Sequence, residues 1–69
     1  MVTKYSNYEV TLPSGGINTG PKHLVIGSVY HHVRDEWNMS DEDASRFCDR
    51  LRRDGQLDGF SFRYIGMVG

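Results

Sequence analysis

The chain has 69 residues, of which eight are basic and nine acidic, so its formal net charge at pH 7 is −1. An overall charge this close to zero cannot drive binding to nucleic acid or to an anionic membrane. Such binding would have to depend on local clusters of basic residues. The hydrophobic share of 38% argues against disorder. Residues 1–69 are therefore predicted to form one small α+β domain.

The sequence contains one cysteine, Cys48, which excludes a disulfide within the chain and favours a reducing compartment. The longest purely apolar run, Leu24–Ile26, is far too short to span a bilayer. The first ten residues lack the apolar segment of a signal peptide. A cytoplasmic location without membrane attachment is the resulting expectation.

A strand is predicted near the start of the chain, followed by a turn. Residues 5–12 alternate in polarity, with Tyr8, Val10 and Leu12 on one side, which is typical of a half-buried strand. The next nine residues, PSGGINTGP at 13–21, are rich in glycine, proline and small polar side chains. This composition predicts a flexible turn that joins two elements.

The segment Lys22–Trp37 allows two interpretations. Its density of β-branched residues favours a strand. Its apolar residues also fall on one face of a helix, and Pro21 suits the first position of that helix. A helix is the preferred prediction and a strand the alternative. The apolar face of the helix would consist of Ile26, Val29, Tyr30, Val33 and Trp37.

The residues after Asn38 carry the clearest helix signals. Ser40 is the predicted N-cap, acidic residues at 41–43 complement the helix dipole, and Gly55 is predicted to end the helix in a left-handed conformation. Apolar residues follow the spacing i, i+3, i+4, i+7 of a helix with one buried face. They are Ala44, Phe47, Cys48 and Leu51.

A turn at Gln56–Gly59 and a strand at Phe60–Ile65 are predicted to complete the domain. Phe60, Phe62 and Tyr64 lie on the apolar side of this strand. The predicted element order is β-α-α-β, with a short antiparallel sheet packed on one or two helices; it becomes β-β-α-β if residues 22–37 form a strand. The core is predicted to consist of these three aromatic residues, residues 8, 10 and 12, and the two helix stripes.

Three patterns suggest catalytic or ligand chemistry, but each lacks an essential part. The loop at residues 15–22 has the glycines of a phosphate-binding loop, but Pro21 replaces its lysine. His31 and His32 project in different directions on a helix, which is unsuitable for one zinc ion. Cys48 lies on an apolar stripe outside any nucleophile motif. The protein is predicted not to be an enzyme and to use no metal or cofactor.

Charged residues cluster on the predicted helices and supply the candidate binding surface. Three arginines share the face opposite the apolar stripe and suit phosphates or an acidic partner. Two predicted i, i+4 pairs, Glu42 with Arg46 and Asp49 with Arg53, partly neutralise this face. The single tryptophan lies between the helices and is the best candidate anchor. The candidate partner-binding residues are Trp37, Arg46, Arg50, Arg53, Asp35, Glu36 and Glu42.

Two parts of the chain resemble known families. The residues GFSFRYI at 59–65 partly resemble the aromatic strand of RNA-recognition domains, through Gly59, Phe60 and Phe62. Packing of these aromatic residues against the helices is the preferred interpretation. The segment 37–64 resembles the closing part of a winged-helix domain, in which a helix ends at an acidic residue and a glycine before a wing strand. Leu51, Asp54, Gly55 and Tyr64 carry this second likeness.

The predicted function is a non-catalytic protein-binding module, such as a small regulator, adaptor or inhibitor of a larger protein. Short intracellular chains, including phage-encoded ones, often have such roles. The alternative, implied by the winged-helix likeness, is a nucleic-acid-binding regulator that uses the arginine-bearing helix. A homodimer is a further option, because a second copy would add to the small buried surface of a chain this size.

Overall fold

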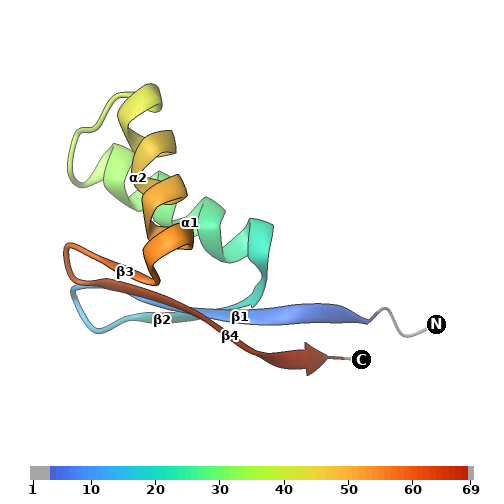
Figure 1. Ribbon diagram of the computed structural model, residues 1–69. Helices are drawn as coiled ribbons and strands as arrows, with labels where there is room; N and C mark the ends of the chain where they lie inside the picture. Colours follow the sequence, from blue (N-terminus) through green and yellow to red (C-terminus); the bar gives the residue numbers. More distant parts are fainter. Residues whose placement is uncertain (1–3, 69) are drawn as a thin grey trace.

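The computed structural model describes residues 4–68, which form a four-stranded antiparallel sheet with two helices on one face (Figure 1). The elements are β1 (Tyr5–Thr11), β2 (Ile17–Pro21), α1 (Lys22–Asp35), α2 (Asp41–Asp54), β3 (Gln56–Leu57) and β4 (Phe60–Val68). The strand order across the sheet is β2-β1-β4-β3. The predicted α+β class is confirmed, and the predicted order β-α-α-β is extended by two short strands, β2 and β3.

The strand β2 occupies residues that the sequence predicted to be part of a turn. The turn is confined to residues 12–16, where the Leu12 N–H donates to the Gly16 carbonyl at 2.7 Å. From Ile17 onward the chain pairs with β1, with Thr11 opposite Ile17 and Asn7 opposite Pro21. The prediction was wrong here because the main-chain groups along β1 need partners, and pairing outweighs the weak strand propensity of INTGP.

The segment after Pro21 is a helix, which confirms the preferred interpretation and excludes the strand alternative. Pro21 is the N-cap and not the first helical residue as predicted, so the helix begins one residue later, at Lys22, and it ends at Asp35, two residues before Trp37. The buried side chains are Val25, Val29 and Val33, whereas Ile26 and Tyr30 are only half-buried. The buried stripe therefore shares Val29 and Val33 with the predicted face but is shifted toward Val25.

The loop between the helices reverses the chain within five residues. Asn38 adopts a left-handed conformation with φ of 55°, and the next N–H, of Met39, donates to the Val33 carbonyl at 3.1 Å. Ser40 then caps α2, its hydroxyl accepting from the Asp43 N–H at 3.1 Å. The helix ends at Gly55, whose φ of 80° is the left-handed conformation predicted from the sequence. Both predicted ends of α2 are confirmed.

A short hairpin replaces the predicted turn at residues 56–59. Gln56 and Leu57 pair with Ser61 and Phe60, and the two residues between the strands, Asp58 and Gly59, both have positive φ. A two-residue hairpin turn of this kind favours the sequence Asp-Gly, because glycine tolerates positive φ and aspartate tolerates it better than most residues. The dipeptide at 58–59 was thus a signal for β3 as well as for the turn.

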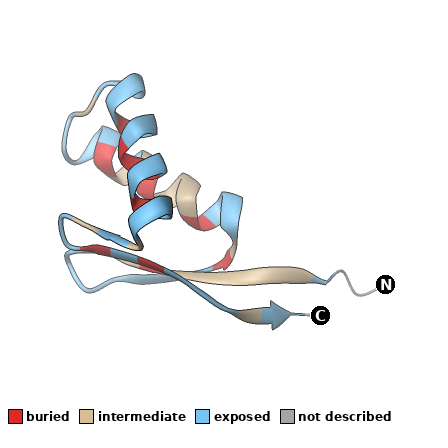
Figure 2. Ribbon diagram, viewed as in Figure 1, coloured by how far each residue is buried: buried red, intermediate tan, exposed pale blue. Residues whose placement is uncertain are grey.

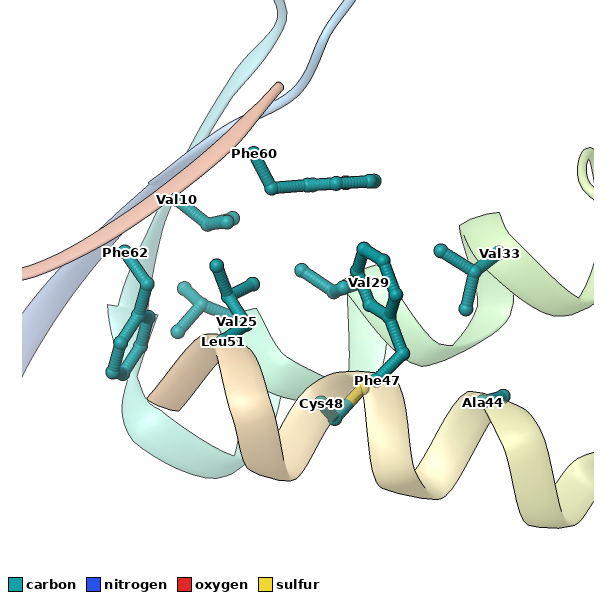
Figure 3. Close-up of a cluster of buried hydrophobic side chains, with 10 residues drawn as sticks. All are labelled: Val10, Val25, Val29, Val33, Ala44, Phe47, Cys48, Leu51, Phe60 and Phe62. Atoms are coloured by element: carbon teal, nitrogen blue, oxygen red, sulfur yellow. The ribbon is translucent and has the colours of Figure 1, made fainter. Parts of the chain in front are cut away.

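The core lies between the helices and one face of the sheet (Figures 2 and 3). Side chains from β1 and β4 point toward the helices and meet the apolar stripes of α1 and α2. The buried hydrophobic side chains are Val10, Val25, Val29, Val33, Ala44, Phe47, Cys48, Leu51, Phe60 and Phe62. All four residues predicted on the stripe of α2 belong to this set.

The prediction of Tyr64 as a core residue was wrong, since its side chain is 53% exposed. Tyr64 pairs with Tyr8 across the strands, and the two rings meet edge to face at 5.5 Å. A β-bulge follows at once, because Tyr8 pairs with Tyr64 and Asn7 with Gly66, which leaves Ile65 unmatched. The helices cover the part of the sheet near the β3–β4 turn, so the C-terminal end of β4 extends beyond them (Figure 1).

The molecule is consequently long and narrow, with extents of 40 × 20 × 20 Å. Beyond the helices, β1 and β4 continue as a two-stranded ribbon in which Tyr5 pairs with Val68 and Ser6 with Met67. Figure 1 shows this ribbon extending away from the helices. The helical end and the ribbon end are thus two separate regions of surface.

Candidate partner-binding face

Trp37 lies in the loop between α1 and α2 and packs on the end of the core. Its ring centroid is 5.6 Å from that of Phe47 on α2 and 5.4 Å from that of Phe60 on β4. The ring of His32 approaches the same cluster, at 6.1 Å from Trp37 and 5.5 Å from Phe60. Trp37 remains 38% exposed. One part of its ring therefore closes the core and the rest faces solvent.

A hollow of about 310 Å³ lies next to Phe47, on the side of α2 near the β3–β4 turn. We refer to it as the α2 hollow. Its lining residues are Met39, Asp43, Arg46, Phe47, Arg50 and Asp58. Two of the three predicted arginines thus line the same hollow as Met39 and the largely buried Phe47, whose ring contacts Trp37.

The ion pairs of α2 differ from those predicted in one case. Arg46 pairs with Glu42, as predicted, and also approaches Asp43 at 3.7 Å. Arg53 does not pair with Asp49: it donates to Asp54 at 2.9 Å, and Asp49 accepts from Arg52 at 2.5 Å instead. The hydrogen bond from the Arg53 guanidinium lowers the pKa of the Asp54 carboxyl.

Arg50 is the arginine that keeps no carboxylate partner among residues 4–68, where Arg34, Arg46, Arg52, Arg53 and Arg63 all form ion pairs. Arg50 lines the α2 hollow and is solvent-exposed. A guanidinium offers several N–H donors in a plane that matches a carboxylate or a phosphate. The α2 hollow therefore combines the apolar residues Met39 and Phe47 with one guanidinium that forms no ion pair within residues 4–68.

The acidic candidates fall into two groups. Glu42 is engaged by Arg46, and Asp41 accepts from the Tyr30 hydroxyl at 3.1 Å and pairs with Arg34 at 3.3 Å. Asp35 and Glu36, at the end of α1, are exposed and form no ion pair within residues 4–68. Nothing in the geometry brings these two carboxylates into the α2 hollow.

A second hollow, of about 410 Å³, surrounds the β3–β4 turn and is lined by residues 56–61. Asp58 borders both hollows. This side chain adds a negative charge to the hollow that Arg46 and Arg50 also line. Met39, Phe47 and Asp58 were not among the predicted binding residues. The sequence signalled only their separate roles as loop, core and turn residues.

Cys48 is buried on α2, where its thiol points toward the Ile26 carbonyl at 3.8 Å. Burial raises the pKa of this thiol, and the nearby Asp49 carboxylate raises it further. Both effects oppose formation of the nucleophilic thiolate. Within residues 4–68, no group of three or more histidine, cysteine or acidic side chains converges as metal ligands.

The likeness to RNA-recognition domains is limited to the sequence of the strand. Phe60 and Phe62 are buried against the helices, and the Phe62 ring stacks on Tyr8 at 5.1 Å. Base stacking requires rings on an open sheet face. The open face here carries the exposed ion pair between Arg63 and Glu9, at 3.0 Å. The preferred interpretation of residues 60 and 62 as core residues is confirmed.

Comparisons with protein-family models, with curated proteins and with solved structures give no significant match to this chain. Neither α1 nor α2, the helices of the described residues, has the length and apolar character needed to cross a membrane.

Proposed function

We propose that the protein is a non-catalytic protein-binding module, a small regulator, adaptor or inhibitor that binds a larger protein through the α2 hollow. The observation that carries this proposal is the pairing of an available guanidinium, Arg50, with the apolar residues Met39 and Phe47 beside the half-exposed Trp37. Tryptophan and arginine are the residue types most enriched among those that dominate binding energy at interfaces.

The chemistry of the α2 hollow defines the segment that fits it. An apolar side chain of the partner would cover Met39 and Phe47, and a carboxylate beside it would accept hydrogen bonds from Arg50. Arg46 is engaged by Glu42, so it would contribute less to such a contact. The binding energy should therefore depend on Arg50 more than on any other arginine of α2.

Nucleic-acid binding by the same helix is the weaker candidate. Phosphate binding depends on several cations that face the ligand together. Three of the four arginines of α2 each pair with a carboxylate of their own, and only Arg50 is free to bind a phosphate. The paired residues are Arg46, Arg52 and Arg53. An acidic protein segment, which needs a single guanidinium, fits this arrangement better than a polyphosphate chain.

The test is a pull-down from the native host, with mass spectrometry of what is retained and two charge-reversal variants. Arg50→Glu should reduce retention of a stoichiometric partner by about tenfold or more, as expected for loss of about 1.4 kcal/mol or more at an arginine anchor. The matched control is Arg52→Glu, the same change on the same helix, at a residue that pairs with Asp49 outside the hollow. It should retain the partner.

Three outcomes separate the proposals. Loss with Arg50→Glu and retention with Arg52→Glu support the proposed face. Equal loss with both variants would mean that the charge of α2 as a whole, and not the α2 hollow, governs binding. Retention of nuclease-sensitive material, with affinity that falls steeply as salt is raised from about 50 mM, would replace the protein partner by nucleic acid.

A further inference from the structure

Two exposed groups follow one another in the loop after α1. Glu36 is the C-cap of α1, and its side chain is exposed and forms no ion pair within residues 4–68. Trp37 comes next, with 38% of its side chain exposed. A free carboxylate and a partly exposed aromatic ring are therefore neighbours in the chain.

This dipeptide has the chemistry that the α2 hollow requires of a ligand. The hollow is lined by the apolar residues Met39 and Phe47, which a ring can cover, and by Arg50, whose guanidinium suits a carboxylate. Within one chain Glu36 and Arg50 form no ion pair, although both are exposed. The chain thus carries both halves of a contact that two copies can complete.

The two halves adjoin on one face of the molecule. The Trp37 ring contacts Phe47, at 5.6 Å between ring centroids, and Phe47 in turn lines the α2 hollow. Across a two-fold axis the same patch of each copy meets the other, so each contact forms twice and both halves must belong to a single patch. The position of Trp37 beside the hollow meets this condition.

The charges of this face permit a second copy and limit its affinity. Asp43 is approached by Arg46 at 3.7 Å, whereas Asp58 forms no ion pair within residues 4–68 and opposes a carboxylate in the hollow. The net charge of −1 adds little repulsion between whole molecules. We therefore expect a dissociation constant between micromolar and millimolar.

We propose that two copies of this chain associate about a two-fold axis beside Phe47. Trp37 of each copy covers Met39 and Phe47 of the other, and the Glu36 carboxylate of each accepts hydrogen bonds from Arg50 of the other. The dimer rests on the function proposed above, because it takes the α2 hollow as the binding surface. It also regulates that surface: the hollow is occupied in the dimer, so a larger partner binds the monomer.

The first test is the molar mass of the full chain by sedimentation equilibrium, over a concentration series from micromolar to millimolar. The wild-type mass should rise from 7.9 kDa toward twice that value. Arg50→Glu and Glu36→Arg should each move the midpoint to at least about tenfold higher concentration, because like charges then meet at both contacts. A wild type that stays monomeric over the whole series overturns the proposal.

A charge swap identifies the pair of residues that meet. In an equimolar mixture of Arg50→Glu and Glu36→Arg, one contact of the mixed dimer is native and the other has its charges exchanged, so association should recover. The double variant should also dimerise, since its exchanged charges are complementary at both contacts. Failure of both to recover, with all variants folded by circular dichroism, would contradict the pairing of Glu36 with Arg50.

Two matched controls make the same charge changes outside the proposed contact. Asp35 precedes Glu36 and is also exposed without an ion pair within residues 4–68, but it projects about 100° away around the helix. Asp35→Arg should leave the midpoint unchanged, as should Arg52→Glu, at a residue that pairs with Asp49. Shifts equal to those of the two test variants would show that net charge governs association and would overturn the proposal.

The single tryptophan reports the contact without any substitution. Its emission should move to shorter wavelength as the mass rises, since the second copy covers the exposed part of the ring. An emission maximum that stays constant while the mass doubles would place the interface elsewhere and overturn the assignment to this face.

Failure of the dimer and failure of the proposed function are distinguishable. The mass measurements use the pure protein and need no partner, whereas the pull-down detects the partner. A monomeric protein that retains a partner through Arg50 overturns the dimer alone. A dimer that passes the charge swap while the pull-down retains nothing overturns the proposed function and leaves self-association as the role of the α2 hollow.

Discussion

Trp37 combines two roles that are usually separate. Its ring contacts Phe47 and Phe60, so its removal would open the end of the core, yet over a third of the side chain faces solvent. A substitution here would change stability and binding together. Arg50 is the cleaner probe of the α2 hollow, because it is exposed and forms no ion pair within residues 4–68.

Cys48 gives a prediction about pH. Burial raises the pKa of its thiol in the folded state above that in the unfolded chain. This contribution to stability is fully present below the ordinary thiol pKa of about 8.5 and is lost as pH rises through the higher folded value. The free energy of unfolding in urea should therefore fall as the pH rises above about 8.5, by more in the wild type than in Cys48→Ala, which serves as the control. Equal falls in both proteins would contradict the prediction.

Single residues show where sequence patterns stop being informative. The spacing of Asp49 and Arg53 allowed an i, i+4 pair, but Arg52 and Asp54 offered competing partners at shorter separations, and these prevailed. Exposed ion pairs differ little in free energy, so spacing alone could not decide among them. The predicted pairs nevertheless left Arg50 without a carboxylate partner, and the ion pairs of residues 4–68 agree on this residue although the partner of Arg53 differs.

At the scale of elements, α2 is the part that the sequence predicted most completely. Its cap at Ser40, its buried stripe and its end at Gly55 all depend on residues within a few positions of one another. The strand β2 depends instead on pairing with β1, and its own residues have little strand propensity. The preference of residues 22–37 for a helix was correct, but the helix ends at Asp35, so Trp37 packs on the core from the loop and the buried stripe of α1 consists of three valines.

Two glycines in or beside the helices should respond to alanine in opposite directions. Gly27 lies inside α1 with open space where a Cβ would be, so Gly27→Ala should stabilise the fold by about 0.5–1 kcal/mol. Gly55 has φ of 80°, where an L-residue is strained, so Gly55→Ala should destabilise it by about 1–2 kcal/mol. Urea unfolding of both variants measures the difference. If both substitutions changed the free energy of unfolding in the same direction, the backbone conformation assigned to one of the two glycines would be contradicted.

At the scale of the whole molecule, the charges contribute little to folding. The ion pairs of the described residues involve mainly exposed side chains, and the buried set contains no polar or charged residue. Exposed pairs contribute roughly 0–1 kcal/mol each and are screened by salt. Stability must come from the apolar core between sheet and helices.

Salt should therefore have a small effect on the free energy of unfolding. Raising sodium chloride from about 0.1 M to about 1 M should lower it by less than about 1 kcal/mol, because screened surface pairs are weak and apolar burial is not screened. The measurement is urea unfolding followed by the fluorescence of the single tryptophan, which packs on the core. A loss of several kcal/mol would show that a charge network holds the fold together.

The two outer edges of the sheet also decide whether the sheet can grow by adding further chains. The edge of β2 ends in Gly20 and Pro21, and proline cannot donate to a neighbouring strand. The edge of β4 is interrupted by the bulge at Ile65. Because head-to-tail growth into open filaments needs an unbroken strand edge on both sides, a concentrated solution should remain clear and form no fibres.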